Sequence, residues 1–310
     1  MIYVGVSACL LGQKVRYDGG HKASGFCQHE LGRHVEYLPL CPEVGVGLSV
    51  PRATIRLIGD VSAPRAVVQK TGEDLTEKLE DFASVRAEQL AKLSGYVLCA
   101  KSPSCGMERV RVYEENSNAN VKQGMGIFAK RLQKMFPAMP MEEDGRLNDP
   151  ELRENFVLRL YVYAEWKQLA ENINKGILYA FHARHKLLLL AHNQAVYREL
   201  GRELGELDAL SDEFLETYIC RLMAALSLPA TRKDHTNVLQ HVQGYFKQHI
   251  DSSSRTELAD LILRYHHGIE PLSAPLTLMN HYLKRYPDAY LESQSYFQPY
   301  PDDLRLRYGL

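Results

Sequence analysis

Three cysteines occupy the same local context, each directly after an apolar segment of strand length. Cys9, Cys41 and Cys105 lie in V-S-A-C, P-L-C-P-E and K-S-P-S-C-G. If the three segments form adjacent parallel strands, the thiols meet at one edge of a sheet, where open α/β sheets place their chemistry. Three thiolates there suit an iron–sulfur cluster with one open iron, a zinc site completed by histidine or water, or a thiol nucleophile. The plainer interpretation of each cysteine is a small buried apolar residue.

The other three cysteines have less informative contexts. Cys99 lies within a predicted strand and Cys220 within a predicted helix, so we interpret both as core residues. Cys27, with His21 and His29 nearby, is either a fourth ligand or an ordinary loop cysteine. Six cysteines in a chain of 310 residues favour metal or thiol chemistry over a disulfide framework.

Polar side chains accompany the three cysteines. Glu43 is two residues after Cys41 and Ser102 is three before Cys105, which makes both candidates for acid–base catalysis. A surface carboxylate and a turn-capping serine are the plainer interpretations. The glycine-rich segment V-R-Y-D-G-G-H-K, soon after Cys9, offers groups to an anionic or heteroaromatic ligand. The substrate-binding candidates are Ser7, Arg16, Tyr17, Asp18, Lys22, Arg52 and Lys101.

Over the first half of the chain, predicted strands alternate with predicted helices, and these elements position the residues named above. Apolar patterns predict strands at 3–8, 35–40, 96–100 and 110–113, and helices at 75–94 and 127–136. Alternation of this kind indicates an α/β fold, a mostly parallel sheet with flanking helices.

The second half is predicted to be all-α. Residues 137–149 are rich in proline, acids and glycine and form the natural boundary, and Asp149-Pro150-Glu151 is a strong helix start. We therefore expect an α/β domain over 1–142 and a helical domain over 149–310. The predicted helices span roughly 150–173, 176–203, 211–227, 234–249, 254–267 and 275–285.

Composition describes an ordinary globular protein with one large or two ordinary domains: 45% of residues are hydrophobic and 24% charged. A formal net charge of -1 gives no whole-molecule signal for nucleic acid, so any such surface must be a local patch. No apolar run approaches membrane-spanning length, and M-I-Y-V-G-V lacks the basic segment of a signal peptide. We expect a cytoplasmic protein without a membrane partner; the sequence does not specify its oligomeric state.

The ordered motifs V-S-A-C-L-L-G-x-x-V-R-Y-D-G-G-H-K, L-C-P-E and K-S-P-S-C-G resemble the TudS family of thiouracil desulfidases. The resemblance covers about residues 1–140. It implies an α/β domain with a [4Fe-4S] cluster on Cys9, Cys41 and Cys105. It also implies a catalytic carboxylate at Glu43 and a catalytic serine at Ser102.

The second half, with F-H-A-R-H-K-L-L-L-L-A-H-N at 181–193, is similar to a helical domain often fused to this desulfidase domain. The combination resembles the RudS proteins, which remove sulfur from 4-thiouridine in tRNA, and this implies tRNA as a partner. Near-zero net charge does not exclude RNA, because phosphate contacts need only a few local cations. The tRNA-binding candidates are Arg184, Lys186, Arg232 and Lys233.

The expected reaction replaces C=S by C=O with water, a hydrolysis that releases hydrosulfide and needs no external electron donor. Glu43 would act as the base that activates water, and Ser102 as a proton relay or donor. Free thiouracil or thiouridine is the alternative substrate. A metal-free persulfide sulfurtransferase using Cys105 and Cys41 is one alternative function, and a zinc-stabilised RNA-binding module is another.

Overall fold

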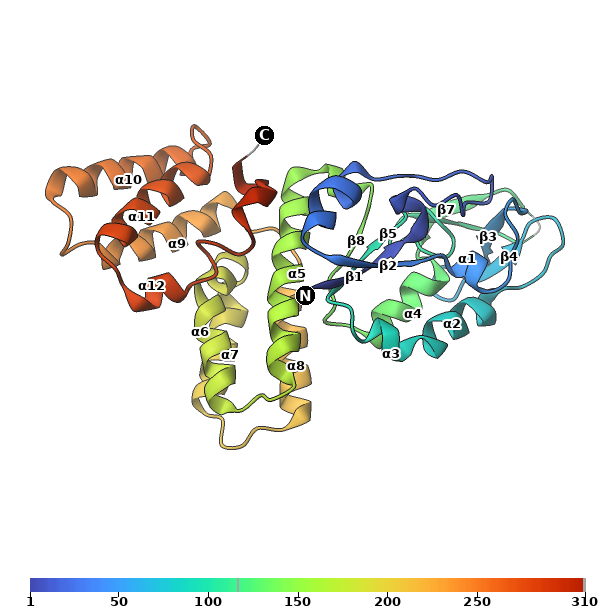
Figure 1. The fold of residues 1–310 in the computed structure, drawn as a ribbon, viewed down its shortest axis with the longest axis horizontal. Helices are drawn as coiled ribbons and strands as arrows, with labels where there is room; N and C mark the ends of the chain where they lie inside the picture. Colours follow the sequence, from blue (N-terminus) through green and yellow to red (C-terminus); the bar gives the residue numbers. More distant parts are fainter. Residues whose placement is uncertain (116, 309–310) are drawn as a thin grey trace. The chain divides into compact units, whose positions relative to one another are not determined.

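The computed structural model describes residues 1–115 and 117–308. The chain divides into two compact units, Met1–Asp149 and Pro150–Leu310. Strands and helices mix in the first unit, whereas the described part of the second is helical (Figure 1). The α/β and all-α fold classes expected from the sequence are therefore confirmed.

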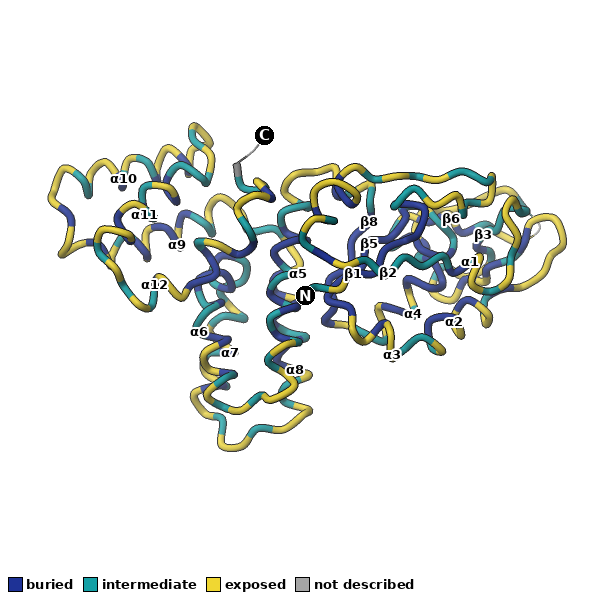
Figure 2. Tube along the Cα trace, in the orientation of Figure 1, coloured by how far each residue is buried: buried dark blue, intermediate teal, exposed yellow. Residues whose placement is uncertain are grey.

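The first sheet contains β1 (Tyr3–Ser7), β2 (Glu36–Leu40), β5 (Gly95–Leu98) and β8 (Met141–Glu143). Its order is β2-β1-β5-β8, and each neighbouring pair is parallel. β5 and all of β1 beyond its first residue are buried (Figure 2). Because the strands share one direction, the segments that follow β1, β2 and β5 emerge at the same edge.

Helices α2 (Thr76–Val85), α3 (Ala87–Leu90) and α4 (Ile127–Met135) lie on one side of this sheet (Figure 1). The predicted helix at 75–94 is thus two shorter ones. Phe128 of α4 is central to the packing: its ring centre is 5.8 Å from that of Phe82 on α2 and 5.8 Å from that of Tyr96 on β5. Edge-to-face contacts of this kind stabilise a core beyond the area that they bury.

A second sheet departs from the expectation of one mostly parallel sheet. Strands β3 (Ile55–Ile58), β4 (Arg65–Val68), β6 (Val110–Tyr113) and β7 (Asn120–Gly124) pair in the order β4-β3-β6-β7. Only the central pair β3–β6 is parallel. The strand predicted at 110–113 exists, but it belongs to this sheet. Its neighbours escaped prediction because they are short and alternate apolar with charged residues, as in I-R-L-I and N-V-K-Q-G.

The second unit consists of helices joined by short connections. They are α5 (Pro150–Ala170), α6 (Lys175–His192), α7 (Gln194–Gly205), α8 (Asp212–Ala225), α9 (Arg232–Tyr245), α10 (Ser252–His266), α11 (Ser273–Arg285) and α12 (Ala289–Ser293). The single helix predicted over 176–203 breaks at Asn193, whose side chain accepts the N–H groups of Ala195 and Val196 and caps α7.

Short turns complete the described chain. A short helix, α1 (Pro42–Gly45), follows β2, and helical turns occupy Ala8–Leu11, Phe26–Glu30, Leu31–Arg33, Arg146–Asn148, Asp302–Leu304 and Leu306–Tyr308. No helix in residues 1–115 or 117–308 is both long and apolar enough to cross a membrane.

The loop after β5, which carries Cys105, is held by the N-terminus of α4. The N–H groups of Ile127 and Ala129 donate to the carbonyl oxygens of Pro103 and Ser104, at 3.1 and 3.2 Å. The first N–H groups of a helix have no partner within the helix, so the loop satisfies donors that would otherwise need water. This backbone contact positions the loop on the rigid body of the domain.

Gly126, just before α4, makes the close approach possible. A Cβ at this position would lie 2.5 Å from the Ser104 carbonyl, although the Gly126 backbone itself suits any residue. We expect Gly126→Ala to displace the loop and to lower the free energy of unfolding in urea by about 1–3 kcal/mol. Gly25→Ala is the matched control, because a Cβ there meets nothing within 4 Å. Equal stability of the two variants would contradict the proposed packing role.

Candidate functional site

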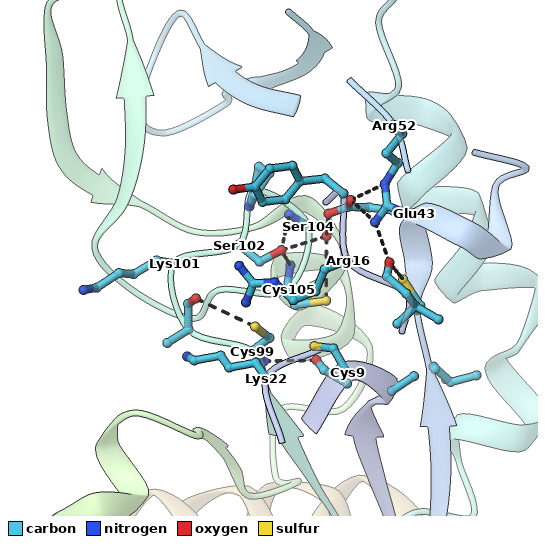
Figure 3. Close-up of a pocket in the computed structure, with 18 residues that line it drawn as sticks. Cys9, Arg16, Lys22, Glu43, Arg52, Cys99, Lys101, Ser102, Ser104 and Cys105 are labelled. Atoms are coloured by element: carbon cyan, nitrogen blue, oxygen red, sulfur yellow. Dashed lines mark hydrogen bonds and ion pairs between the residues drawn. The ribbon is translucent and has the colours of Figure 1, made fainter. Parts of the chain in front are cut away.

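A cavity of about 410 Å³ lies where β1, β2 and β5 end (Figure 3). Cys9 lies in the turn after β1, Cys41 directly precedes α1, and Cys105 lies in the loop after β5. The parallel sheet therefore brings three cysteines that are far apart in sequence to one cavity. The lining residues include Ser7, Cys9, Arg16, Tyr17, Lys22, Cys41, Glu43, Arg52, Cys99, Lys101, Ser102, Ser104 and Cys105.

The phenol of Tyr96 is buried in the core of the first unit. Burial raises the pKa of Tyr96 well above its usual value, and charge on Cys105, Cys41 and Cys9 raises it further. The Tyr96 hydroxyl is buried and has no hydrogen-bond partner among the described residues. Because buried polar groups are normally hydrogen-bonded, this hydroxyl is an exception within the core.

Burial also controls the thiols themselves. It raises the pKa of Cys105 and of Cys41, and the nearby charge of Glu43 acts in the same direction. A hydrogen bond from Ser7 to Cys105 lowers the pKa of that thiol by less than burial raises it. The charge of Arg52 lowers the pKa of Cys41, but by less than burial raises it, so burial favours the protonated form of both thiols; a bound metal would favour the thiolates.

No three His, Cys, Asp or Glu side chains among residues 1–115 and 117–308 form a group that would hold one metal ion. The sulfurs instead belong to three different segments of the cavity wall.

Glu43 is anchored by an ion pair with Arg52. Its Oε2 accepts hydrogen bonds from Arg52 Nε at 2.8 Å and Nη2 at 2.6 Å. Only 5% of the Arg52 side chain and 12% of the Glu43 side chain are exposed. Nη2 of Arg52 also donates to the carbonyl oxygen of Val15 at 3.0 Å, which links α1 to the segment after β1. The carboxylate is therefore fixed in direction, with Oε1 left for other partners.

Two serine hydroxyls connect Glu43 to the loop after β5. Ser104 Oγ donates to Glu43 Oε1 at 2.7 Å and lies 2.9 Å from Ser102 Oγ. A hydroxyl has one proton, so Ser102 donates to Ser104 when Ser104 donates to Glu43. Ser102 Oγ also accepts the N–H groups of Cys105 at 3.1 Å and Ser104 at 3.3 Å, which is the turn-capping role. The result is a directed chain from Ser102 through Ser104 to Glu43 (Figure 3).

Lys22 connects the glycine-rich segment to the loop after β8. Its Nζ lies 2.7 Å from Oδ2 of Asp144, whose Oδ1 accepts the N–H of Ala100 at 2.8 Å. Arg16 and Tyr17 line the cavity beside it. Asp18 does not: its Oδ1 accepts the N–H of Gly20 at 2.9 Å within the turn.

Apart from Asp18, the catalytic, metal and substrate-binding candidates named from the sequence all line this cavity; their roles stay predictions. Sequence reasoning overlooked Ser104, although its place in K-S-P-S-C-G beside Cys105 was a usable signal. The interpretation of Cys99 as a core residue was incomplete. Cys99 is 8% exposed, lines the cavity and lies in hydrogen-bonding contact with Cys9. Cys27 is fully buried outside the cavity, and burial raises its pKa to about 11.

The tRNA-binding candidates lie on two helices of the second unit. Arg184 Nε on α6 donates to Glu165 Oε2 at 3.1 Å, so its charge is already paired. Lys186 on the same helix is half-buried. Arg232 and Lys233 are exposed at the start of α9. RNA binding by these residues stays a prediction.

Two family models match the chain. The model for 2-thiouracil desulfurase matches residues 4–144. A model described as a protein of unknown function (DUF1722) matches residues 186–301.

Two curated proteins and one solved structure are similar to the chain. YbgA, an uncharacterized protein of Escherichia coli (strain K12), is 41% identical over 166 residues, which are 53% of this chain and 98% of YbgA. YbbK, an uncharacterized protein of Bacillus subtilis (strain 168), is 32% identical over 108 residues, which are 33% of this chain and 71% of YbbK. The structure of the [4Fe-4S]-dependent thiouracil desulfidase TudS aligns with 31% identity and a TM-score of 0.41, over 51% of this chain and 99% of TudS.

The buried Glu43–Arg52 ion pair is expected to contribute to the free energy of unfolding. Arg52→Ala leaves a largely buried carboxylate without its cation, and we expect the free energy of unfolding in urea to fall by about 3 kcal/mol. Glu43→Ala added to Arg52→Ala should cost less than the sum of the two single changes, since the double variant leaves no unpaired charge.

Arg65→Ala is the matched control, because Arg65 pairs with Asp74 and Glu115 on the exposed surface. Its expected cost is below about 1 kcal/mol. Strict additivity of the Arg52 and Glu43 changes would show that the pair is not coupled.

Proposed function

Because the chain belongs to the family of YbgA and YbbK and carries a 2-thiouracil desulfurase domain over residues 4–144, we propose that it is a [4Fe-4S]-dependent desulfidase. It converts a thiocarbonyl to a carbonyl by hydrolysis and releases hydrosulfide. Its substrate is 4-thiouridine in tRNA. The convergence of three cysteines and the Ser102–Ser104–Glu43 chain on one cavity carries the proposal.

The residues of the cavity fit such a cluster. Cys9, Cys41 and Cys105 supply three thiols from three segments, as expected where each sulfur binds a different iron. A [4Fe-4S] cluster held there would supply an iron without a protein ligand, a Lewis acid toward the soft thiocarbonyl sulfur.

Glu43 is the base of the proposed reaction. Its carboxylate is held by Arg52 and faces the cavity, where it can take a proton from the water that attacks the thiocarbonyl carbon. The water oxygen becomes the carbonyl oxygen, and the carbon–sulfur bond breaks. The proton taken by Glu43 can return through Ser104 to Ser102, with the hydrogen bonds of the chain reversed, and Ser102 passes its own proton to the departing sulfur. One water is consumed and one hydrosulfide leaves, so no electron donor is needed.

RNA as substrate is supported by the second unit and by the cations of the cavity wall. The second unit is similar to the helical domain that accompanies tRNA 4-thiouridine desulfidases, as the sequence resemblance implies. Arg16, Lys22 and Lys101 line the cavity and suit the phosphates that flank a nucleotide. A tRNA nucleotide would have to leave its base stack to enter a cavity of about 410 Å³.

The substrate assignment is tested by incubating the anaerobic, cluster-containing full chain with total tRNA and analysing the nucleosides. We expect loss of 4-thiouridine and a matching gain of uridine. Intact 4-thiouridine alongside turnover of free 4-thiouracil would transfer the assignment to a free thiopyrimidine. An active, colourless, iron-free protein would instead favour a persulfide mechanism.

Two groups of variants separate cluster binding from catalysis. Substitution of Cys9, Cys41 or Cys105 by serine should remove both iron and turnover. Glu43→Gln and Ser104→Ala should keep the iron content and visible absorbance but lower kcat, by about a hundredfold and about tenfold respectively. The measurements are iron analysis, visible absorbance and steady-state kinetics.

Cys220→Ser is the control for the cysteine series, since Cys220 lies on α8 in the second unit and should tolerate the change. Full turnover by Glu43→Gln, or retention of iron by all three cysteine variants, would refute the assigned roles.

A further inference from the structure

A second, larger cavity opens next to the thiol-lined one. It has a volume of about 640 Å³ and lies over the second sheet. Tyr17, Glu43, Lys101 and Pro103 line both cavities, so the two lie side by side. A ligand longer than one nucleotide that places one end in the thiol-lined cavity has this groove next to it.

Cations form a row across the open face of the sheet. Arg111 on β6 is directly opposite Lys122 on β7, and the parallel register of β3 with β6 places Arg56 beside Arg111. These three side chains line the groove, together with Lys101 and Arg109. We call Arg56, Arg111 and Lys122 the cationic row. Val112, next to Arg111 on β6 and on the opposite face, belongs to the apolar core.

The groove is poor in compensating acids. Among the described residues that line it, Glu43 is the one acid, and Arg52 already pairs with it; of the cations, Arg109 pairs with Glu108 outside the groove. In the described parts of the chain, neither Arg111 nor Lys122 lies within 4.0 Å of a carboxylate oxygen. Like charges directly opposite each other on paired strands are destabilising. Such a pair is more easily explained by a ligand than by folding.

Backbone conformation gives a second indication. Two cationic residues of the groove, Lys101 and Arg109, have backbone conformations in the left-handed region, with φ of 63° and 53°. Residues other than glycine rarely adopt this conformation, and those that do are concentrated at ligand-binding sites. Tyr17 and Tyr113 add aromatic surface to the same groove, and the Arg56 guanidinium lies 4.7 Å from the Tyr113 ring centre.

We propose that the cationic row binds the phosphodiester backbone of the RNA strand whose thiolated nucleotide occupies the thiol-lined cavity. The proposal rests on the proposed function and extends it to the domain that carries the cysteines. Cations on three neighbouring strands span on the order of 10 Å, more than a single phosphate can contact. Aromatic side chains beside a cationic groove are the usual combination for single-stranded nucleic acid.

The test compares Arg111→Ala/Lys122→Ala with Lys92→Ala/Lys134→Ala in the cluster-containing full chain. Both pairs remove two positive charges, but Lys92 and Lys134 lie outside the groove. Binding of a labelled tRNA is measured by fluorescence anisotropy over a salt series. We expect the row variant to bind about tenfold more weakly, with the slope of log Kd against log salt reduced by about 1.5. The control pair should show neither change.

Steady-state kinetics on tRNA, free 4-thiouridine and 4-thiouridine 5′-monophosphate show whether the row binds an RNA strand or a single phosphate. For the row variant, kcat/KM on tRNA should fall about tenfold relative to kcat/KM on free 4-thiouridine. An equal fall in kcat/KM on 4-thiouridine 5′-monophosphate would show that the row binds a single phosphate and not an RNA strand, and would overturn the proposal. Unchanged tRNA affinity and salt slope would also overturn it. If the wild-type chain removes sulfur from none of the three substrates, the proposed function fails instead, and the anisotropy data still decide whether the row binds RNA.

Discussion

Parallel pairing of β1 with both β2 and β5 is the constraint on which the site depends. Cys9, Cys41 and Cys105 are separated by 32 and 64 residues of chain, and no local structure could bring them together. Three strands that run in one direction in one sheet deliver their following segments to one edge. The close approach of β1 and β5 requires Gly5, because a Cβ there would lie 2.2 Å from the ring of Tyr96.

Fixed charge then organises the cavity that this edge encloses. Arg52 directs one oxygen of Glu43, and the remaining oxygen accepts a hydroxyl chain that runs back to Ser102. Asp144 and Lys22 secure the opposite wall in the same manner. Glu43 and Lys22 are each held by partners from another segment, and Ser102 by its own loop, so the geometry of the carboxylate and hydroxyls is set before any ligand arrives.

The residues that carry the chemistry could be predicted, whereas several of their connections could not. A cysteine after an apolar strand is visible in sequence, and so is a carboxylate two residues beyond it. The contact between Ser104 and Glu43 spans 61 residues and has no local pattern. The second sheet was hidden for a related reason: β3 and β7 alternate apolar and charged residues over four or five positions, too short for a clear period. The helical unit was easier, because α5 and α6 span many turns; the capping role of Asn193 and the short helix α12 (Ala289–Ser293) were overlooked.

The loop after β5 is tethered to α4 through main-chain atoms, with the carbonyl groups of Pro103 and Ser104 as acceptors. These contacts do not depend on side-chain identity, so apart from Ser102, which caps the turn, the loop can keep its path while its side chains are exchanged. Substitutions in this loop can therefore change the reactivity of the site, in evolution or by design, without loss of the contacts that fold the loop. The demanding position is Gly126, which touches no substrate, and a family comparison that looked only for reactive residues would pass over it.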